Sequence, residues 1–177
     1  SARRPCVWRD GPGQYRMWVN SAPDPDGHFR AMAGAIFRFT STDGLHWERD
    51  AEPAVTADGE VAATIVYPFV VEDDGDYTMW YGCHVDDMQR FEIYCSTSSD
   101  GLTWTDHRQA PSFPATLSDE DFDGRYTSTP CVVDDGDRWL LYYSARDWGK
   151  IYGTEDGRLE VDSMSIYRHI GVAWCAK

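Results

Sequence analysis

The sequence repeats one phrase three times at nearly constant spacing. Each copy opens with a proline and a short apolar run, passes through an Asp-Gly pair and ends in an aromatic-rich run. The opening prolines, which are 63 and then 62 residues apart, are Pro5, Pro68 and Pro130. Self-similarity at a fixed period indicates one supersecondary unit used several times, each burying its faces against its neighbours. We therefore divide the chain approximately into units of residues 1–62, 63–124 and 125–177, within a single domain.

Each unit is predicted to consist of antiparallel strands. Apolar and aromatic runs on either side of Asp-Gly are typical of a β-hairpin, because these turn residues tolerate positive φ. In the first two units a third run ends in Ser-x-Asp-Gly-Leu-x-Trp, at residues 41–47 and 98–104, and its Trp is expected to begin a fourth strand. Four antiparallel strands per repeat indicate a propeller blade. No helical period is sustained, so we expect an all-β propeller of about three four-stranded blades.

The third unit lacks the Ser-x-Asp-Gly phrase. Residues 166–175 read as its third strand, and two residues follow. Propellers close with about four to eight blades, so three units do not make a ring. Either the chain is part of a longer one or copies associate to cover the open edges, which would otherwise offer unpaired backbone groups. We expect a homo-oligomer, with a dimer of six units favoured.

The charge and the cysteines exclude several classes of function. A formal net charge of −14 argues against nucleic acid and anionic membranes as partners. The acidic runs at 73–76 and 134–137 lie at repeated turn positions without calcium-loop spacing, and no zinc spacing occurs, so no metal or cofactor is expected. The five cysteines form no C-x-x-C pair and read as small buried residues of a reduced compartment. With no evident signal peptide or membrane run, a cytoplasmic location is expected.

The repeated phrases resemble the five-bladed β-propeller glycosidases, the superfamily of glycoside hydrolase families 43, 32, 62 and 68. The likeness is clearest in the third unit, at Thr-Pro-Cys-Val (129–132), Trp-Leu-Leu-Tyr-Tyr (139–143) and Tyr-Arg-His-Ile (167–170). It implies a carbohydrate ligand at the propeller axis and hydrolysis by carboxylates near the axial ends of inner strands. This chain departs from that pattern directly before its strand prolines, where Arg4, Tyr67 and Thr129 stand and none is acidic.

The resemblance and the strand positions select candidate carboxylates. Glycoside cleavage uses two carboxyls, roughly 5–5.5 Å apart for retention or roughly 6.5–9.5 Å for inversion. Asp123, seven residues before Pro130, resembles the Asp of an Asp-Pro-Tyr-Phe phrase in similar proteins, and Glu92 enters a third strand. We predict Asp123 and Glu92 as the catalytic pair. Other suitably placed acids are Asp86, Asp87 and Asp147.

Seven residues are predicted to bind substrate. Histidines could orient a sugar hydroxyl, arginines could grip a carboxylate or phosphate through their fork geometry, and aromatic rings in rim loops could stack on a pyranose. The predicted residues are Arg4, Tyr67, His84, Tyr126, Arg146, Trp148 and His169. Arg90 and Arg168 are weaker candidates of the same kind. Each also has a structural interpretation: a hydrogen-bonded histidine, an arginine paired with an acid, or a ring in the core.

Two functions remain open. The first is a glycoside hydrolase-like protein that acts on a sugar or glycoside through acid and base carboxylates at the axis. The alternative is a non-catalytic carbohydrate-binding or scaffold module on the same fold, with an aromatic and arginine-lined pocket and no acid pair. We rank the hydrolase first because the superfamily is mostly enzymatic.

Overall fold

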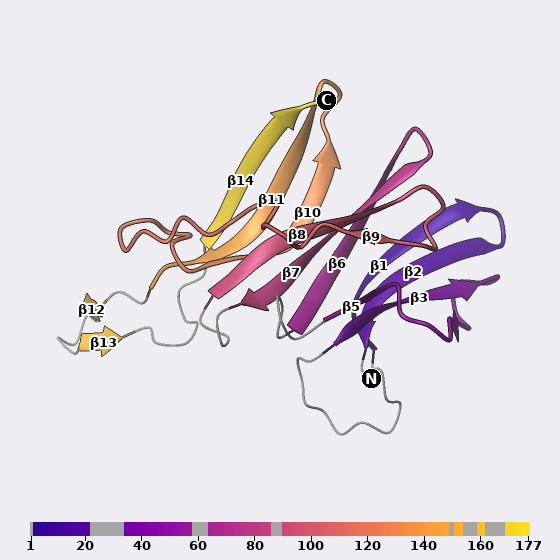
Figure 1. The fold of residues 1–177 in the computed structure, drawn as a ribbon, viewed down its shortest axis with the longest axis horizontal. Coiled ribbons are helices and arrows are strands. Elements are labelled where there is room, and N and C mark those ends of the chain that lie inside the picture. The colour runs from indigo at the N-terminus through magenta and orange to yellow at the C-terminus, as the bar shows by residue number, and fades with distance from the viewer. Residues whose placement is uncertain are drawn as a thin grey trace.

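The computed structural model describes residues 2–21, 34–57, 64–85, 90–148, 151–153, 159–161 and 169–177. Throughout these ranges the chain forms strands and turns without a helix, which confirms the all-β prediction (Figure 1). The same ranges therefore contain no helix able to cross a membrane. Strands of the first unit are β1 (Ala2–Gly11), β2 (Gln14–Ser21), β3 (Ala35–Ser41), β4 (Glu48–Arg49) and β5 (Val55–Thr56). They form one antiparallel sheet in the order β1-β2-β3-β4, with β5 also paired to β3.

The second and third units share a larger sheet. Strands of the second unit are β6 (Thr64–Asp73), β7 (Asp76–Val85), β8 (Arg90–Ser98) and β9 (Thr105–Asp106). Strands of the third are β10 (Tyr126–Asp134), β11 (Arg138–Arg146) and β14 (His169–Ala176), and a separate hairpin holds β12 (Ile151–Gly153) and β13 (Leu159–Val161). The sheet order is β14-β11-β10-β8-β7-β6, with β9 on β8. One parallel pairing, between Tyr126 and Phe91, joins the two units.

The first strand of every unit contains the same irregularity. The pairing register shifts around the strand proline, between Arg3 and Cys6 in β1 and at the equivalent places in β6 and β10. Directly before each proline the backbone has positive φ: 57° at Arg4, 60° at Tyr67 and 50° at Thr129. A bulge bends its strand and redirects a side chain, and a strained non-glycine residue costs of order 1–3 kcal/mol. The sequence repeat is therefore also a repeat of backbone conformation.

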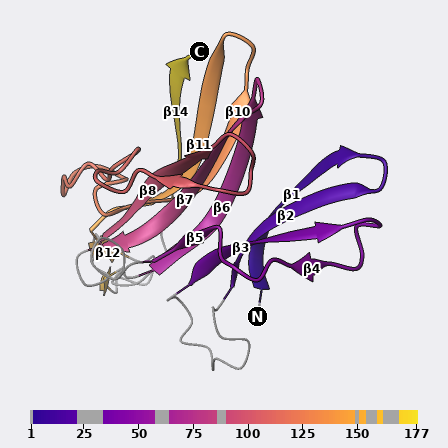
Figure 2. The ribbon, with the colours of Figure 1, turned by 45° about the vertical axis from the view of Figure 1, so that its right-hand side comes forward.

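The core lies between successive units. Trp18, Ile36 and Val55 of the first unit pack against Tyr81, Tyr94 and their neighbours in the second. On the other side of the second unit, Ile93 packs with Tyr143 and Ala145 of the third. The second unit thus buries one face against each neighbour, as the repeat predicts, and Figure 2 shows the first sheet as a layer beside the larger one.

The three first strands lie around a common hollow. Strand β6 contacts both β1 and β10. A cavity of about 480 Å³ opens between them and is lined by residues of all three, including Trp8, Val70 and Val132. The first strands are therefore the inner strands of the arrangement.

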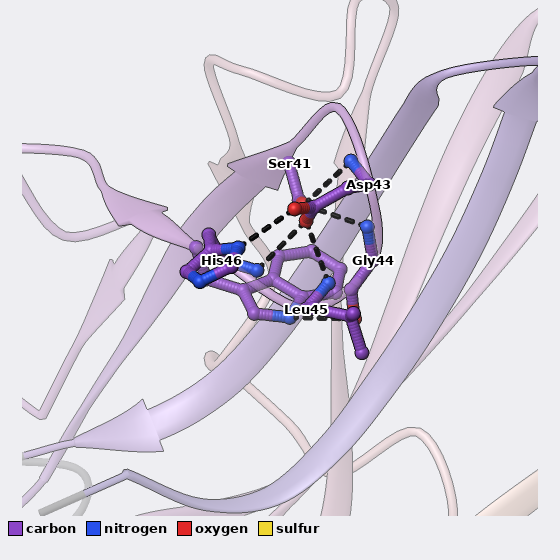
Figure 3. Close-up of polar contacts among 6 residues, drawn as sticks. Ser41, Asp43, Gly44, Leu45 and His46 are labelled. Carbon is purple, nitrogen blue, oxygen red and sulfur yellow. Dashed lines mark hydrogen bonds and ion pairs between the residues drawn. The ribbon is translucent and has the colours of Figure 1, made fainter.

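The Ser-x-Asp-Gly phrases form matching turns, of which Figure 3 shows the one at Ser41–His46. The Ser41 hydroxyl accepts from the Gly44 amide at 2.8 Å and donates to the Asp43 carboxylate at 3.1 Å. That carboxylate also accepts from the Leu45 and His46 amides, each at 2.8 Å, and contacts His46 Nδ1 at 2.7 Å. These contacts lower the pKa of Asp43, with the His46 side chain as the largest cause, and the carboxylate raises the pKa of His46.

The second unit repeats the turn with a different residue before the Trp. Ser98 and Asp100 make the equivalent hydrogen bonds, and Thr103 stands where the first unit has His46. Backbone hydrogen bonds from Thr103 and Leu102 lower the pKa of Asp100. In both units the fourth strand starts one residue after the Trp and is only two residues long, so the predicted fourth strands are present but short.

The third unit leaves one face exposed. Along β14, alternate residues face solvent: Ile170 is 82% exposed, Val172 58% and Trp174 67%. Cys131 and Cys175 of this unit are exposed too, whereas Cys83 is buried. The expectation that all five cysteines are buried is therefore wrong: Cys6 and Cys95 are half-buried, and no described residue covers the side chain of Cys131 or Cys175.

Candidate functional site

Four side chains stand in a row across one end of the larger sheet. His84 of β7 pairs with Phe91 of β8, Phe91 with Tyr126 of β10, and Tyr126 with Arg146 of β11. Strands β7 and β11 end at this row while β8 and β10 begin there, so the four side chains lie at one edge of the sheet. Three of the four were predicted from the sequence to bind substrate.

Phe91 is the centre of an aromatic group. Its ring centroid lies 4.4 Å from that of His84, 5.7 Å from that of Tyr126 and 6.1 Å from that of Tyr67. Tyr67 comes from β6, where the bulge before Pro68 sets its backbone. Contacts of this kind contribute about 0.5–1.5 kcal/mol each beyond burial. Sequence analysis missed Phe91, which reads as an ordinary apolar residue at the start of a strand.

Three guanidinium groups lie over these rings. Arg4 lies 4.1 Å from the centroid of the Tyr67 ring. Arg146 and Arg125 lie 5.0 Å and 5.1 Å from that of Tyr126, within the range of cation–π attraction. Arg125 is also 5.8 Å from the Trp148 ring. Arg125 was not predicted, although its place directly before an inner strand was a usable signal.

We call this group the arginine–aromatic cluster. Its members come from all three units and are linked by the ring and cation–π contacts given above. They are Arg4, Tyr67, His84, Phe91, Arg125, Tyr126, Arg146 and Trp148. Six of the seven predicted substrate-binding residues are therefore brought together, and His169 lies elsewhere in the third unit.

A glycine makes room for the central ring. A Cβ atom on Gly82 would lie 2.0 Å from Cε1 of Phe91, far inside contact distance. Gly82 and Phe91 lie on neighbouring strands, in which the pairing sets Gly82 opposite Ile93. The Phe91 ring thus lies directly over Gly82 of β7, and the other rings contact it there.

The buried carboxyls of the described residues are Glu92, Asp123 and Asp147. All three were candidates from the sequence. The other candidates, Asp86, Asp87 and Arg168, lie outside the described residues. Across the described ranges, no group of three or more His, Cys, Asp and Glu side chains is arranged to hold a metal ion.

Glu92 lies on the face of β8 opposite Phe91, since successive side chains of a strand point to opposite faces. It is 3% exposed, accepts a hydrogen bond from the Tyr94 hydroxyl at 3.4 Å and forms an ion pair with Arg90 at 3.3 Å. Tyr94 belongs to the core between the first and second units. Burial, and secondarily the charge of Glu92, raise the pKa of Tyr94.

Asp123 belongs to a different network. The Tyr143 hydroxyl donates to Asp123 at 2.9 Å, and burial followed by this hydrogen bond raises the pKa of Tyr143. The Tyr143 ring lies against Gly171, where a Cβ atom would approach it to 2.3 Å. Phe122 stacks on Tyr143 and also contacts His169, with centroids 6.4 Å and 5.7 Å apart.

The remaining candidates lie beside this second network. His169 Nε2 is 4.0 Å from the Asp147 carboxylate. Tyr143 packs on Ile93, which points away from the side of β8 that carries Glu92. Glu92 and Asp123 therefore lie on opposite faces of the second unit. Each accepts a hydrogen bond from a different tyrosine, Tyr94 and Tyr143 respectively. The catalytic pair stays a prediction.

The chain is similar in sequence to two uncharacterized proteins. No protein-family model matches the chain. Two uncharacterized proteins from strains of Mycobacterium tuberculosis, Rv1502 and MT1551, are each 31% identical to it over 146 residues. The match covers 82% of this chain and 47% of either relative. The chain thus spans about half the length of the curated relatives it matches.

Solved structures of similar fold come from carbohydrate-active proteins. A family 117 glycoside hydrolase, Zg3597 from Zobellia galactanivorans, has a TM-score of 0.68 and 15% identity. The match covers 98% of this chain and 52% of the hydrolase chain. An N-acetylgalactosamine deacetylase from F. plautii, solved with blood group B trisaccharide, has a TM-score of 0.65 and 19% identity, covering 97% and 49%. A glycosyl hydrolase from Bacteroides ovatus has a TM-score of 0.57 and 17% identity, covering 90% and 51%.

These likenesses define the class of fold. Identities of this size show the fold and leave the reaction open. The chain shares its all-β fold with these solved structures, among which are glycoside hydrolases. About half of each of those longer chains corresponds to this one.

Proposed function

We propose that this protein is a glycosidase-like, carbohydrate-active protein whose ligand binds at the arginine–aromatic cluster. The observation that carries the proposal is the convergence of rings and guanidinium groups from all three units at one end of the sheet. The faces of Tyr126 and Trp148 suit the apolar faces of a pyranose, and Arg and His side chains suit its hydroxyls as donors. The glycoside hydrolases among proteins of similar fold support a sugar as ligand.

Hydrolysis would use Asp123 and Glu92, the first choices from the sequence. Both are buried, and both adjoin the cluster along the chain: Glu92 follows Phe91, and Asp123 lies two residues before Arg125. Two carboxyls on either side of the scissile bond would act as acid and as base or nucleophile. In that role each would first have to exchange its tyrosine partner for the substrate.

The non-catalytic alternative is favoured by one observation. Glu92 and Asp123 hydrogen-bond to different tyrosines on opposite sides of the second unit. A carbohydrate-binding module needs the cluster without an acid pair. Hydrolysis assays on E92Q and D123N separate the two functions: the enzyme loses turnover and keeps sugar binding, whereas the module shows no turnover in any form.

The proposal is tested by a glycan-binding screen followed by calorimetry on two tyrosine variants. Tyr126→Ala removes the ring that Arg125 and Arg146 contact, and we expect about a two- to tenfold loss of affinity, since aromatic contacts are worth about 0.5–1.5 kcal/mol. The control is Tyr15→Ala, because Arg9 lies 5.9 Å from the Tyr15 ring in a similar pair on β1 and β2. Equal affinity of both variants would contradict the assignment of the site.

We also propose that the three units are blades of a propeller ring and that copies of the chain associate. The recurring bulge, the common hollow between β1, β6 and β10, and the exposed face of β14 support this arrangement. Glycan binding at the cluster does not depend on how the ring is completed.

A further inference from the structure

We propose that the arginine–aromatic cluster selects acidic sugars, meaning glycans that carry a carboxylate on the ring, as uronic acids do. This inference rests on the proposed function and adds the class of substrate. It follows from three observations: the cations gathered in the cluster, the backbone that places one of them, and the rings beside them.

The first observation is the placement of cations in an acidic protein. The chain has a net charge of −14, yet three guanidinium groups surround the linked rings of Tyr67 and Tyr126. A long-range negative field repels anions, so an anion binds only where positive charge is concentrated locally.

The second observation is how the fold places Arg4. This residue occupies the bulge before Pro5 with φ of 57°, and its exposed side chain lies over Tyr67, the bulge residue of the next unit. The third bulge carries Thr129, whose hydroxyl donates to Ser144 at 2.6 Å. The fold thus provides three equivalent bulge positions. They carry the cation of Arg4, the ring of Tyr67 and the hydroxyl of Thr129.

The third observation distinguishes a sugar acid from a free oxyanion. A guanidinium stacked on a ring directs its N–H groups along its own plane, where a planar carboxylate can accept two of them. The aromatic faces of Tyr126 and Trp148 lie next to those groups. A ring-borne carboxylate can use both kinds of contact at once, whereas phosphate or sulfate can use only the cations.

The test compares one glycan in two charge states. Calorimetry would measure oligogalacturonate and its methyl ester, which share rings and size but differ in the carboxylate charge. We expect the acid to bind about tenfold more tightly or better, since a hydrogen bond to a charged group is worth about one factor of ten or more. Raising the salt concentration should weaken binding of the acid more than binding of the ester.

Two arginine variants locate the effect. Arg4→Gln should lose about tenfold in affinity for the acid and much less in affinity for the ester. Arg9→Gln is the control, because Arg9 lies over Tyr15 outside the cluster and should change neither ligand. Both residues are exposed, so folding is not at risk in either variant.

Each remaining outcome overturns a defined claim. If acid and ester bind equally well, the acidic-sugar inference fails while the proposed function stands. If inorganic phosphate binds as tightly as the sugar acid and displaces it, the cluster is an oxyanion site and the sugar-acid inference fails. If neither these ligands nor any neutral glycan binds, the proposed function itself fails.

Discussion

Phe91 and Gly82 together determine where the cluster lies. The Phe91 ring contacts His84, Tyr67 and Tyr126, and it can do so only because Gly82 leaves the space beneath it empty. Tyr143 and Gly171 repeat this arrangement in the third unit, where the ring carries the hydroxyl that bonds to Asp123. Two glycine–ring pairs thus position the cluster and one candidate carboxyl separately.

Gly82→Ala should weaken glycan binding by displacing the Phe91 ring. The overpacked side chain should also cost about 1–3 kcal/mol of unfolding free energy. The matched control is Gly171→Ala, which should cost a similar amount of stability by displacing Tyr143 while leaving the cluster rings in place. Calorimetry and urea unfolding on both variants check this, and wild-type affinity in Gly82→Ala would show that Phe91 does not position the site.

His46 should titrate above its ordinary pKa because Asp43 stabilises its charged form. The stability that the charged His46 contributes is therefore fully present below its pKa in the unfolded chain, about 6.5. It is lost as the pH rises through the higher pKa of His46 in the folded protein. NMR titration of the imidazole measures this directly. Asp43→Asn should bring the His46 pKa down towards 6.5, and Asp100→Asn, in the equivalent turn, should leave it unchanged; an Asp43→Asn protein with an unaltered His46 titration would refute the pairing.

The strands themselves were readable because their ends are marked by turn chemistry. The Asp74-Gly75 pair and the Ser98-Asp100 phrase bound strands of the second unit, and equivalents bound those of the first, whereas Pro68 lies within β6. The bulges could not be predicted from the sequence, because a proline in a strand does not reveal the φ of the residue before it. The contact between Arg4 and Tyr67 follows from those bulges and from packing between units, so sequence spacing could select both residues without showing that they touch.

The candidate carboxyls illustrate the same limit. Burial of Glu92 and Asp123 agrees with their selection as inward-facing acids. Their separation depends on the alternation of side chains along β8 and on which neighbouring unit packs against each face of the second unit. Neither is evident from the amino-acid sequence. Arg125 was missed although it directly precedes β10, because its contacts with the Tyr126 and Trp148 rings depend on packing.

Ser98→Ala should destabilise the second unit through its turn. The Ser98 hydroxyl accepts from the Asp100 and Gly101 amides and donates to the Asp100 carboxylate, so its loss should cost about 1–3 kcal/mol. Ser99→Ala, one residue on in the same exposed turn, is the control and should change stability by less than about 0.5 kcal/mol. Urea unfolding measures both, and equal midpoints would contradict a structural role for the phrase.

The whole molecule presents an apolar face that the described residues leave uncovered. Ile170, Val172 and Trp174 alternate along β14 on that face, and exposed patches of this kind mark interaction surfaces. We expect copies of the chain to associate there, with a dimer in light scattering coupled to gel filtration. Trp174→Glu should shift the mass to that of a monomer, whereas Leu45→Glu, at an isolated exposed position, should not. A wild-type protein that is monomeric at every concentration would rule out this association.

The most direct test of the carbohydrate site is chemical-shift mapping of the backbone amides during titration with a glycan that the screen identifies. We predict that the largest shifts fall on Arg4, Tyr67, Phe91, Tyr126, Arg146 and their neighbours, across all three units at one end of the sheet. Shifts confined to the Ser-x-Asp-Gly turns, or spread along the exposed face of β14, would contradict the account.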